Sequence, residues 1–430
     1  MTTQTWKTET TRPTRIRWFL IFWMFLVGAI GYLDRVNISI AGQAIAREFH
    51  FSDIQLGWVF SAFVLGYALF QAPGGSIADR FGPRVVLAVG VVWWGFFTSL
   101  ITVLFPGVAG LLAIVIGIRF LLGVGEAVVY PSSNCVVAAW IPSSERGIAN
   151  GFIFAGVGFG AGIASPLITY FMLHHGWRSS FWVSSLLGLA AGLVWYLLAR
   201  DKPAQHRSVN AQELELIQRG LPQSGTGPRA GAKLPWRAIL SNANLLKMTF
   251  AYFGYGYSAY IFFSWFFIYL SKVRGLDLKQ SSYYTMLPFL AMAIGSPLGG
   301  WISDRITRRA GKYWGRCVFS GCAVALSGVF LALGTQVGSA RWASLVLAGG
   351  AGALYLSQSC YWSMSADIGK ASAGSVSGLM NMGNQIGGTV TASLTPVIAA
   401  NFGWTASFLV AACLSVAGAI SWMLVKPEKG

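Results

Sequence analysis

A chain of 430 residues with 55% apolar and only 10% charged side chains, and a mean hydropathy of +0.58, cannot cover a water-soluble surface, because a soluble domain carries about 25% charged residues. The composition instead predicts a membrane protein, in which each spanning helix needs about 20 mainly apolar residues. A net charge of +17 would suit a nucleic-acid partner. The basic residues lie between apolar runs and form no soluble basic domain, so we expect no nucleic-acid role.

The N-terminal stretch up to Phe19 has no early apolar core and no small-residue cleavage site. We therefore expect the first helix to be retained rather than removed as a signal peptide. Apolar runs then recur along the whole chain and predict an all-α membrane protein with twelve transmembrane helices. In chain order the predicted spans are residues 18–41, 54–75, 84–104, 108–131, 148–171, 178–198, 245–270, 283–303, 315–336, 341–365, 373–398 and 404–424.

The distribution of basic residues predicts the orientation of these helices. If the N-terminus is cytoplasmic, most of the 31 Lys and Arg residues fall in inward-facing segments. That bias agrees with the positive-inside rule, so we expect both termini in the cytoplasm. The polar, basic segment 199–244 is predicted to be a cytoplasmic linker between two six-helix bundles, residues 1–198 and 245–430. Within it, AQELELIQR at residues 211–219 is a candidate amphipathic helix.

The two halves repeat one another in sequence. GSIADR at residues 75–80 corresponds to GWISDR at residues 300–305. A constant offset also relates glycines of the fifth and eleventh spans, which indicates halves related by duplication. Glycines spaced four or five apart share one helix stripe and permit close backbone approach, either as tight packing or as a moving hinge. The corresponding glycines are Gly151, Gly156 and Gly160 in the first half and Gly378, Gly383 and Gly387 in the second.

Over its full length the chain resembles the major facilitator superfamily. The resemblance rests on Gly75-xxx-Asp79-Arg80-x-Gly82-x-Arg84 between the second and third spans, and on its degenerate copy Gly300-xxx-Asp304-Arg305. It implies a transporter of the inner (plasma) membrane that works as a monomer by alternating access. It also implies a cytoplasmic gate formed by Asp79, Arg80 and Arg84, with Asp79 near the positive N-terminal end of the eleventh helix.

Four ionisable side chains lie well inside the predicted spans, namely Asp34 and Arg35 in the first and Arg119 and Glu126 in the fourth. Each costs about 2.5–3.5 kcal/mol at a helix centre, so we expect a role beyond structural ion pairing. Arg119 and Glu126 are two turns apart and share a face, whereas adjacent Asp34 and Arg35 point about 100° apart. A crosswise arrangement, in which each acid faces the arginine of the other helix, satisfies both constraints.

The chemistry of these four groups predicts an anionic substrate and proton coupling. A buried guanidinium offers a permanent bidentate partner for a carboxylate or a phosphate. Burial raises the pKa of a carboxylate and a neighbouring arginine lowers it. A buried carboxylate beside an arginine can therefore gain and lose a proton. When protonated, the acid would release the arginine for the substrate, and when ionised it would recapture it. Protons would then be the coupling ion, with no other cofactor.

A narrower resemblance is to the anion:cation symporter family, in particular to proton-coupled galactonate-type carriers. It rests on Tyr32-x-Asp34-Arg35-x-Asn37 in the first span and on Arg119-Phe-x-x-Gly-x-Gly-Glu126, followed by Tyr130-Pro131, in the fourth. The resemblance implies hexonates, hexuronates, glucarate, tartrate or phthalate as substrates. By motif position, Arg35 would bind the substrate carboxylate beside Tyr32 and Tyr67, Asp34 and Glu126 would be the protonation sites, and Arg119 would be the partner of an acid.

The second half offers polar side chains for the rest of the substrate. Asn381-x-x-Asn384 in the eleventh span matches a pair that this family presents to sugar hydroxyls from one helical face. The sequence departs from the family at Phe267, where a proline is expected, and the seventh span is rich in aromatic residues. Two interpretations of these aromatic residues are open. They could shape a pocket for a substrate other than a hexonate, or they could be bulky side chains that face lipid. Further binding candidates are Ser357, Gln358, Tyr257 and Tyr260, with Ser359 and Ser264 beside them.

The main hypothesis is therefore a proton-coupled symporter that imports a sugar acid. The alternatives are an organic-anion or organophosphate exchanger of the same fold, and uptake of a non-sugar carboxylate such as tartrate or phthalate. A drug:proton antiporter is disfavoured because two cavity arginines repel cations. A membrane enzyme is disfavoured because the five cysteines and four histidines form no nucleophile–base or metal-ligand constellation. We expect no catalytic residue and no metal site.

Overall fold

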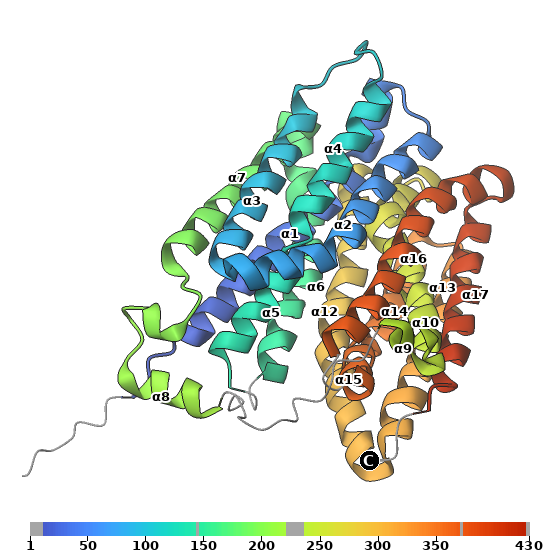
Figure 1. Cartoon of the computed structure of the whole chain (residues 1–430). Helices are drawn as coiled ribbons and strands as arrows, with labels where there is room; N and C mark the ends of the chain where they lie inside the picture. Colours follow the sequence, from blue (N-terminus) through green and yellow to red (C-terminus); the bar gives the residue numbers. More distant parts are fainter. Residues whose placement is uncertain (1–11, 143–145, 221–235, 370–372, 427–430) are drawn as a thin grey trace, which may run out of the picture.

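A computed structural model describes residues 12–142, 146–220, 236–369 and 373–426, which are helical apart from short connections (Figure 1). The helices of the first half and of the linker are α1 (Ile16–Phe49), α2 (Asp53–Phe81), α3 (Pro83–Leu100), α4 (Leu111–Glu126), α5 (Val129–Trp140), α6 (Arg146–His175), α7 (Trp177–Leu198), α8 (Ala211–Gly220) and α9 (Trp236–Ser241). Those of the second half are α10 (Ala243–Tyr260), α11 (Phe266–Ile268), α12 (Leu278–Ala310), α13 (Phe319–Gln336), α14 (Ala340–Leu356), α15 (Gln358–Gly369), α16 (Ala373–Phe402) and α17 (Trp404–Met423).

The helices form the predicted twelve-span fold of two six-helix bundles, drawn in blue to green and in yellow to red in Figure 1. In the described residues, nine helices are long and apolar enough to cross a bilayer. The other three predicted spans are helical as well but more polar or interrupted. α10 continues through wide π-helical turns (Ile261–Trp265 and Tyr269–Val273), α14 and α15 are separated at Ser357, and α16 carries a polar face.

Corresponding helices of the two halves are interrupted at corresponding places. The fourth span breaks between α4 and α5, directly after Glu126, and the tenth breaks between α14 and α15. Such interruptions of membrane-spanning helices occur where they are buried in protein or line a cavity. The first break places Glu126 at the C-terminal end of α4, so its side chain lies at the level where the helix stops.

The predicted amphipathic helix of the linker is present as α8, and it docks on the start of α1. Glu213 of α8 is fully buried and its carboxylate accepts hydrogen bonds from the Thr14 hydroxyl at 2.6 Å and from the backbone amides of Ile16 and Arg17. It also pairs with the Arg17 guanidinium at 3.1 Å. This carboxylate satisfies orphan amides at the N-terminus of α1. The start of α1 and the linker therefore lie on the same side of the molecule.

The two bundles are joined in the half of the molecule away from the linker. Ser39 of α1 donates to the backbone carbonyl of Ser264, and Ser61 of α2 donates to that of Thr389 in α16. Lys272 forms an ion pair with Asp53 at the start of α2. α1 runs from the linker side to Phe49, and α2 begins at Asp53, so these contacts close the side opposite the linker.

The repeated glycines bring helix backbones together in the same way in both halves. A Cβ atom at Gly160 of α6 would lie 2.1 Å from the carbonyl oxygen of Ala29 in α1. The corresponding Gly387 of α16 would place its Cβ 2.2 Å from the carbonyl oxygen of Phe253 in α10. Both distances exclude any side chain, so the predicted close backbone approach is confirmed for these two positions.

We expect alanine at either close-approach glycine to destabilise the protein. Gly160→Ala and Gly387→Ala should each cost about 1–3 kcal/mol, because the added methyl overlaps a backbone that must move. Differential scanning fluorimetry of purified protein in detergent measures the effect as a lower melting temperature. Matched controls are Gly151→Ala and Gly378→Ala, which belong to the same repeat and have open space around the new Cβ. Equal melting temperatures for all four variants would contradict the packing role.

Candidate functional site

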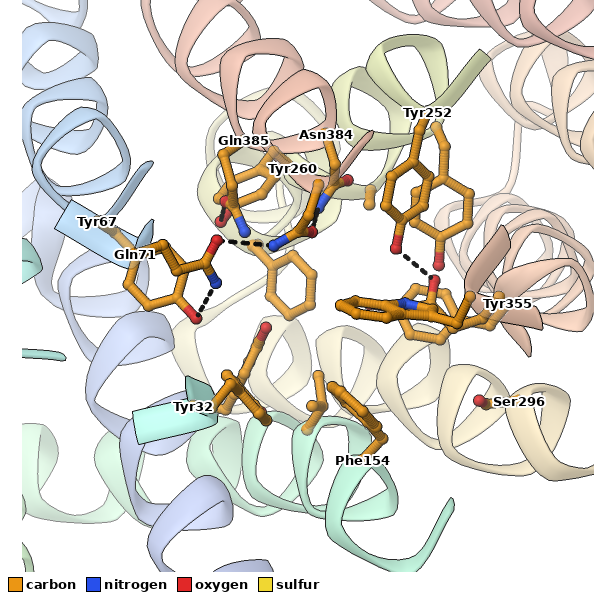
Figure 2. A pocket seen from close by; sticks show the side chains of 18 residues that line it. Tyr32, Tyr67, Gln71, Phe154, Tyr252, Tyr260, Ser296, Tyr355, Asn384 and Gln385 are labelled. Atoms are coloured by element: carbon orange, nitrogen blue, oxygen red, sulfur yellow. Dashed lines mark hydrogen bonds between the residues drawn. The ribbon is translucent and has the colours of Figure 1, made fainter. Parts of the chain in front are cut away.

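A central cavity lies between the bundles, with side chains from α1, α2, α5 and α6 on one side and from α10, α12, α14, α15 and α16 on the other (Figure 2). Tyrosine hydroxyls and side-chain amides dominate its lining. The tyrosines are Tyr32, Tyr67, Tyr130, Tyr252, Tyr255, Tyr260 and Tyr355, and the amides are Gln71, Gln358, Asn381, Asn384 and Gln385. A smaller adjoining cavity shares Tyr32, Tyr260 and Phe263 with it and is also lined by the guanidinium-bearing side chains Arg35 and Arg119.

The predicted pairing of Arg35 with Glu126 is confirmed. Nε of Arg35 donates to Oε1 of Glu126 at 2.9 Å, and both side chains are buried. The guanidinium carbon lies 4.5 Å from the ring centre of Tyr32 and 4.3 Å from that of Tyr67, so two aromatic faces hold the charge by cation–π attraction. Nη1 of Arg35 and Oε2 of Glu126 have no hydrogen-bond partner among the described residues. The pair therefore retains donor and acceptor capacity for a ligand.

A glycine makes room for the Glu126 carboxylate. Gly31 lies one turn before Arg35 on α1, and a Cβ atom there would lie 2.7 Å from Oε1 of Glu126. The carboxylate is already held by the guanidinium, so it could not withdraw without lengthening the ion pair. Gly31 is thus a positioning residue for Glu126, although nothing in the predicted motifs distinguished it.

In the second pair of the predicted crosswise arrangement, Asp34 and Arg119 interact electrostatically but do not form a hydrogen-bonded ion pair. Asp34 accepts a hydrogen bond from the hydroxyl of Thr98 in α3 at 2.8 Å, and it interacts with Arg119 through space without a hydrogen bond. The Arg119 guanidinium lies 4.8 Å from the ring centre of Phe63, and its Nε has no partner among the described residues. Asp34 faces α3 because adjacent residues of a helix point in different directions. It lies inside the first bundle, whereas Arg35 and Arg119 face the smaller cavity.

A chain of hydrogen bonds crosses the cavity from one bundle to the other (Figure 2). The amide of Gln71 donates to the Tyr67 hydroxyl at 3.2 Å and accepts from the amide of Asn381 at 2.8 Å. Asn381 in turn accepts from Asn384 at 3.4 Å. The predicted residues Tyr67, Asn381 and Asn384 are thus brought together, and Gln71 is the link between them. Side-chain amides both donate and accept hydrogen bonds, so these groups can also bind a polar ligand.

Tyr260 and Gln358 also line the cavity, as predicted. The Tyr260 hydroxyl donates to Gln385 at 2.8 Å, and the Tyr252 hydroxyl donates to Gln358 at 3.3 Å. Most of the aromatic residues of the seventh span belong to the protein interior or line the cavity, and those that line it supply three hydroxyl groups and the ring of Phe263. The interpretation of this span as a shaped pocket therefore holds for Tyr252, Tyr255 and Tyr260.

Two predicted substrate-binding residues do not reach the cavity. The Ser357 hydroxyl is buried at the junction of α14 and α15, where it donates to the carbonyl oxygen of Leu354 at 2.6 Å. Tyr257 is two residues beyond Tyr255, about 200° around the helix, so it projects into the second bundle. Neither side chain is part of the cavity lining.

The predicted gate residues lie on the linker side of the first bundle. Nε of Arg84 donates to the carbonyl oxygen of Tyr196 at 2.9 Å, and the backbone amide of Arg84 donates to Asp201 of the linker. Arg80 is exposed, and the side chain of Asp79 lies outside the described residues. In this conformation Arg84 contacts α7 and the linker rather than the second bundle.

Sequence reasoning missed several neutral cavity residues. Gln71, Tyr355, Trp362 and Gln385 line the cavity but belong to no motif. A weak signal was available for two of them, because Gln71 lies one turn beyond Tyr67 and Gln385 adjoins Asn384. In the part of the chain that the structure describes, no group of three His, Cys, Asp or Glu side chains could hold a metal ion.

The sequence profile of the major facilitator superfamily matches residues 24–392. The chain belongs to the major facilitator superfamily. It is accordingly a multi-pass membrane transporter and not an enzyme. It is 35% identical over 408 residues to the probable sulfoacetate transporter SauU of Cupriavidus necator, covering 94% of this chain and 92% of that protein. It is 30% identical over 402 residues to the hexuronate transporter of Bacillus subtilis, covering 92% of each protein.

A solved structure of another superfamily member supports the same fold. A bacterial homologue of the human lysosomal transporter Spinster, in an inward-facing and unoccupied conformation, superposes with a TM-score of 0.75. The match covers 95% of this chain and 96% of that chain at 18% identity. At this identity the likeness shows the major facilitator fold alone.

We expect removal of Arg35 to destabilise the transporter through its partner. Arg35→Gln leaves the Glu126 carboxylate buried without a cation, which costs up to about 3–5 kcal/mol. Adding Glu126→Gln should restore most of the melting temperature, because the unpaired charge is then gone. The control is Glu215→Gln in α8, since its pair with Arg219 is exposed and contributes little. A double variant no more stable than Arg35→Gln would contradict this account.

Proposed function

We propose that this transporter is a proton-coupled symporter that imports a small organic anion, with a sugar acid as the best candidate, by alternating access. The proposal is carried by one observation, the buried ion pair of Arg35 and Glu126 beside a cavity of neutral hydrogen-bonding groups. The relatives named for sulfoacetate and hexuronate support an organic anion. The proton is the coupling ion in this proposal, and no further cofactor is needed.

The mechanism follows from competition for the Arg35 guanidinium. When Glu126 is ionised it pairs with the Arg35 guanidinium, and a substrate carboxylate has to compete with it for that cation. A proton on Glu126 removes that competition, so the substrate carboxylate takes the place of the glutamate between the Tyr32 and Tyr67 rings. Loss of the proton on the inner side returns the glutamate to Arg35 and expels the substrate. Substrate and proton thus bind together and leave together.

The other candidate residues receive supporting roles in this scheme. Asp34, hydrogen-bonded to Thr98 and close to Arg119, is proposed as a second protonation site that adjusts the charge within the first bundle. Asn381 and Asn384 would bind substrate hydroxyls, in place of the bonds they now make with Gln71 and with each other.

The transporter is proposed to work as a monomer in the inner membrane, with both termini and the linker in the cytoplasm, which fits the basic residues on that side. We further propose that Asp79, Arg80 and Arg84 take part in closing the linker side when the site faces outward. Arg84 is already held there by Tyr196 and Asp201.

A second candidate is uptake of a small non-sugar anion, which the 35% identity to the probable sulfoacetate transporter favours. An anion of that kind would use the same Arg35 guanidinium but would leave most of the amide lining unused. An organophosphate exchanger would instead show uptake that depends on a counter-substrate rather than on a proton gradient.

The deciding experiment is uptake into proteoliposomes under an inward proton gradient. We expect one carboxylate from a panel of galacturonate, glucuronate, galactonate, gluconate, glucarate, tartrate, sulfoacetate and glycerol 3-phosphate to accumulate. Glu126→Gln should keep counterflow exchange but lose accumulation, because its side chain no longer carries the coupling proton. The exposed Glu215→Gln serves as the control.

A further variant separates the position of the carboxylate from its charge. Gly31→Ala displaces the Glu126 carboxylate without removing it, so uptake should slow while its dependence on the proton gradient remains. Accumulation by Glu126→Gln at the wild-type level, or uptake indifferent to the gradient, would exclude the proposed coupling.

A further inference from the structure

The cavity has two chemically different ends. Tyr67 and Gln71 lie at one end, and Tyr355 and Phe154 lie across the cavity from them (Figure 2). The second end is built mainly from rings contributed by both bundles. We call it the aromatic subsite and define it by five residues, Tyr130 and Phe154 of the first bundle and Tyr252, Tyr355 and Trp362 of the second.

The rings of the aromatic subsite are fixed in place by one another. Tyr130 and Phe154 stack with their planes 9° apart and their centres separated by 5.1 Å. Phe154 meets Trp362 across the bundle boundary at 5.8 Å. Tyr252 is held by stacking on Tyr361 at 4.4 Å and by its hydrogen bond to Gln358. Flat apolar faces with polar edges are thus presented from both bundles to a ligand between them.

No cation accompanies these rings. The lining of the central cavity contains no Lys or Arg in the part of the chain that the structure describes, and the nearest guanidinium is that of Arg35 behind Tyr32 and Tyr67. A second negative charge on the ligand would therefore be desolvated without a partner, which is costly. The part of the ligand in the aromatic subsite must be neutral.

The cavity lining also contains buried polar atoms that need partners. The Tyr130 hydroxyl and Oδ1 of Asn384 are buried and have no hydrogen-bond partner among the described residues, although both side chains line the cavity. Leaving such groups unpaired in a bound complex costs free energy. An aromatic acid would cover these rings but leave the two polar atoms unpaired, whereas a ring that carries hydroxyl groups would contact the rings and also supply hydrogen-bond partners.

We propose that the aromatic subsite selects a monoanionic sugar acid in its closed-ring form, a hexuronate-type pyranose. This inference rests on the proposed function, in which Arg35 takes the carboxylate. The ring then lies against the surface that Phe154 and Trp362 form together, where a C–H face contacts the aromatic rings and its hydroxyl groups reach toward Tyr130, Gln358 and Asn384. An open-chain acid has no such face and loses more conformational freedom when it is bound.

The test measures binding to the purified transporter in detergent by isothermal titration, with five six-carbon sugar acids and one aromatic acid. Galacturonate and glucuronate form rings, galactonate and gluconate are open chains, glucarate is a dianion, and 4-hydroxybenzoate is a flat aromatic acid. We expect the ring-forming acids to bind at least ten-fold more tightly than the other four. Equal or tighter binding of an open-chain, dianionic or aromatic acid would overturn the proposal.

Variants then assign the selectivity to the aromatic subsite. Trp362→Leu should weaken galacturonate binding at least ten-fold and leave galactonate binding within two-fold, so that the preference for a ring disappears. Phe154→Leu, on the opposite bundle, should act in the same direction and provides a second measurement if the first variant folds poorly. The control is Trp342→Leu in α14, whose side chain faces outward and is 66% exposed.

The outcomes separate this inference from the proposed function. If sugar acids accumulate with protons but rings and chains bind equally, or Trp362→Leu and Phe154→Leu keep the ring preference, the subsite assignment is wrong and the symporter remains. If no sugar acid binds and sulfoacetate does, both the sugar-acid function and the ring subsite are wrong. If no carboxylate or sulfonate binds at all, the proposed role of Arg35 in binding the acid group of the substrate is wrong as well.

Discussion

A guanidinium and a carboxylate inside an apolar bundle must stay together, and the structure around Arg35 and Glu126 is organised by that requirement. Separated from each other and from water, each charge would cost several kcal/mol. The glycine at position 31 leaves space for the carboxylate, and the rings of Tyr32 and Tyr67 cover the guanidinium. Under the proposed function, an anion replaces the glutamate on Arg35 when Glu126 is protonated, so protonation and anion binding would be linked at this site.

Gene duplication supplied the framework, but the two halves have diverged in chemistry. Gly160 and Gly387 bring equivalent helices into contact with the same geometry, so the scaffold is shared. Among the described residues of the membrane spans, the buried charges belong to the first half, while the facing helices of the second half present tyrosine, amide and tryptophan side chains. A symmetric scaffold with an asymmetric lining suits a substrate that is itself asymmetric, charged at one end and neutral at the other.

The features that sequence predicted well are those with a high energetic cost. Intramembrane charges are rare because they are expensive, so Arg35 and Glu126 stood out and their pairing could be predicted from helix periodicity. The repeated spacing of the glycines predicted which helices are in contact for the same reason. Only glycine tolerates a backbone oxygen about 2 Å from its Cβ position. The fold followed from the spacing of apolar runs and from the loop motif.

Low-cost features were harder to predict. Gln71 and Trp362 are neutral, and nothing in a single sequence distinguishes a polar side chain that lines a cavity from one that bonds within its own helix. Ser357 illustrates the second case, because its hydroxyl bonds to a backbone carbonyl one turn away. The direction of Asp34 toward Thr98 depends on how α1 is rotated against α3, which is set by tertiary packing rather than by local pattern.

The binding site and the closure on the side opposite the linker are built on the same two helical segments. Ser39 lies one turn beyond Arg35 on α1, and Ser264 lies one turn beyond Tyr260 in the seventh span, where the wide π-helical turns begin. The Tyr32 ring, about one turn before Arg35, meets Phe263 across the bundle boundary at 5.4 Å. A ligand that alters the separation of α1 and α10 at Arg35 and Tyr260 must therefore alter the Ser39–Ser264 contact as well. Coupling between substrate binding and closure thus needs no distant relay, because one turn of helix separates the two.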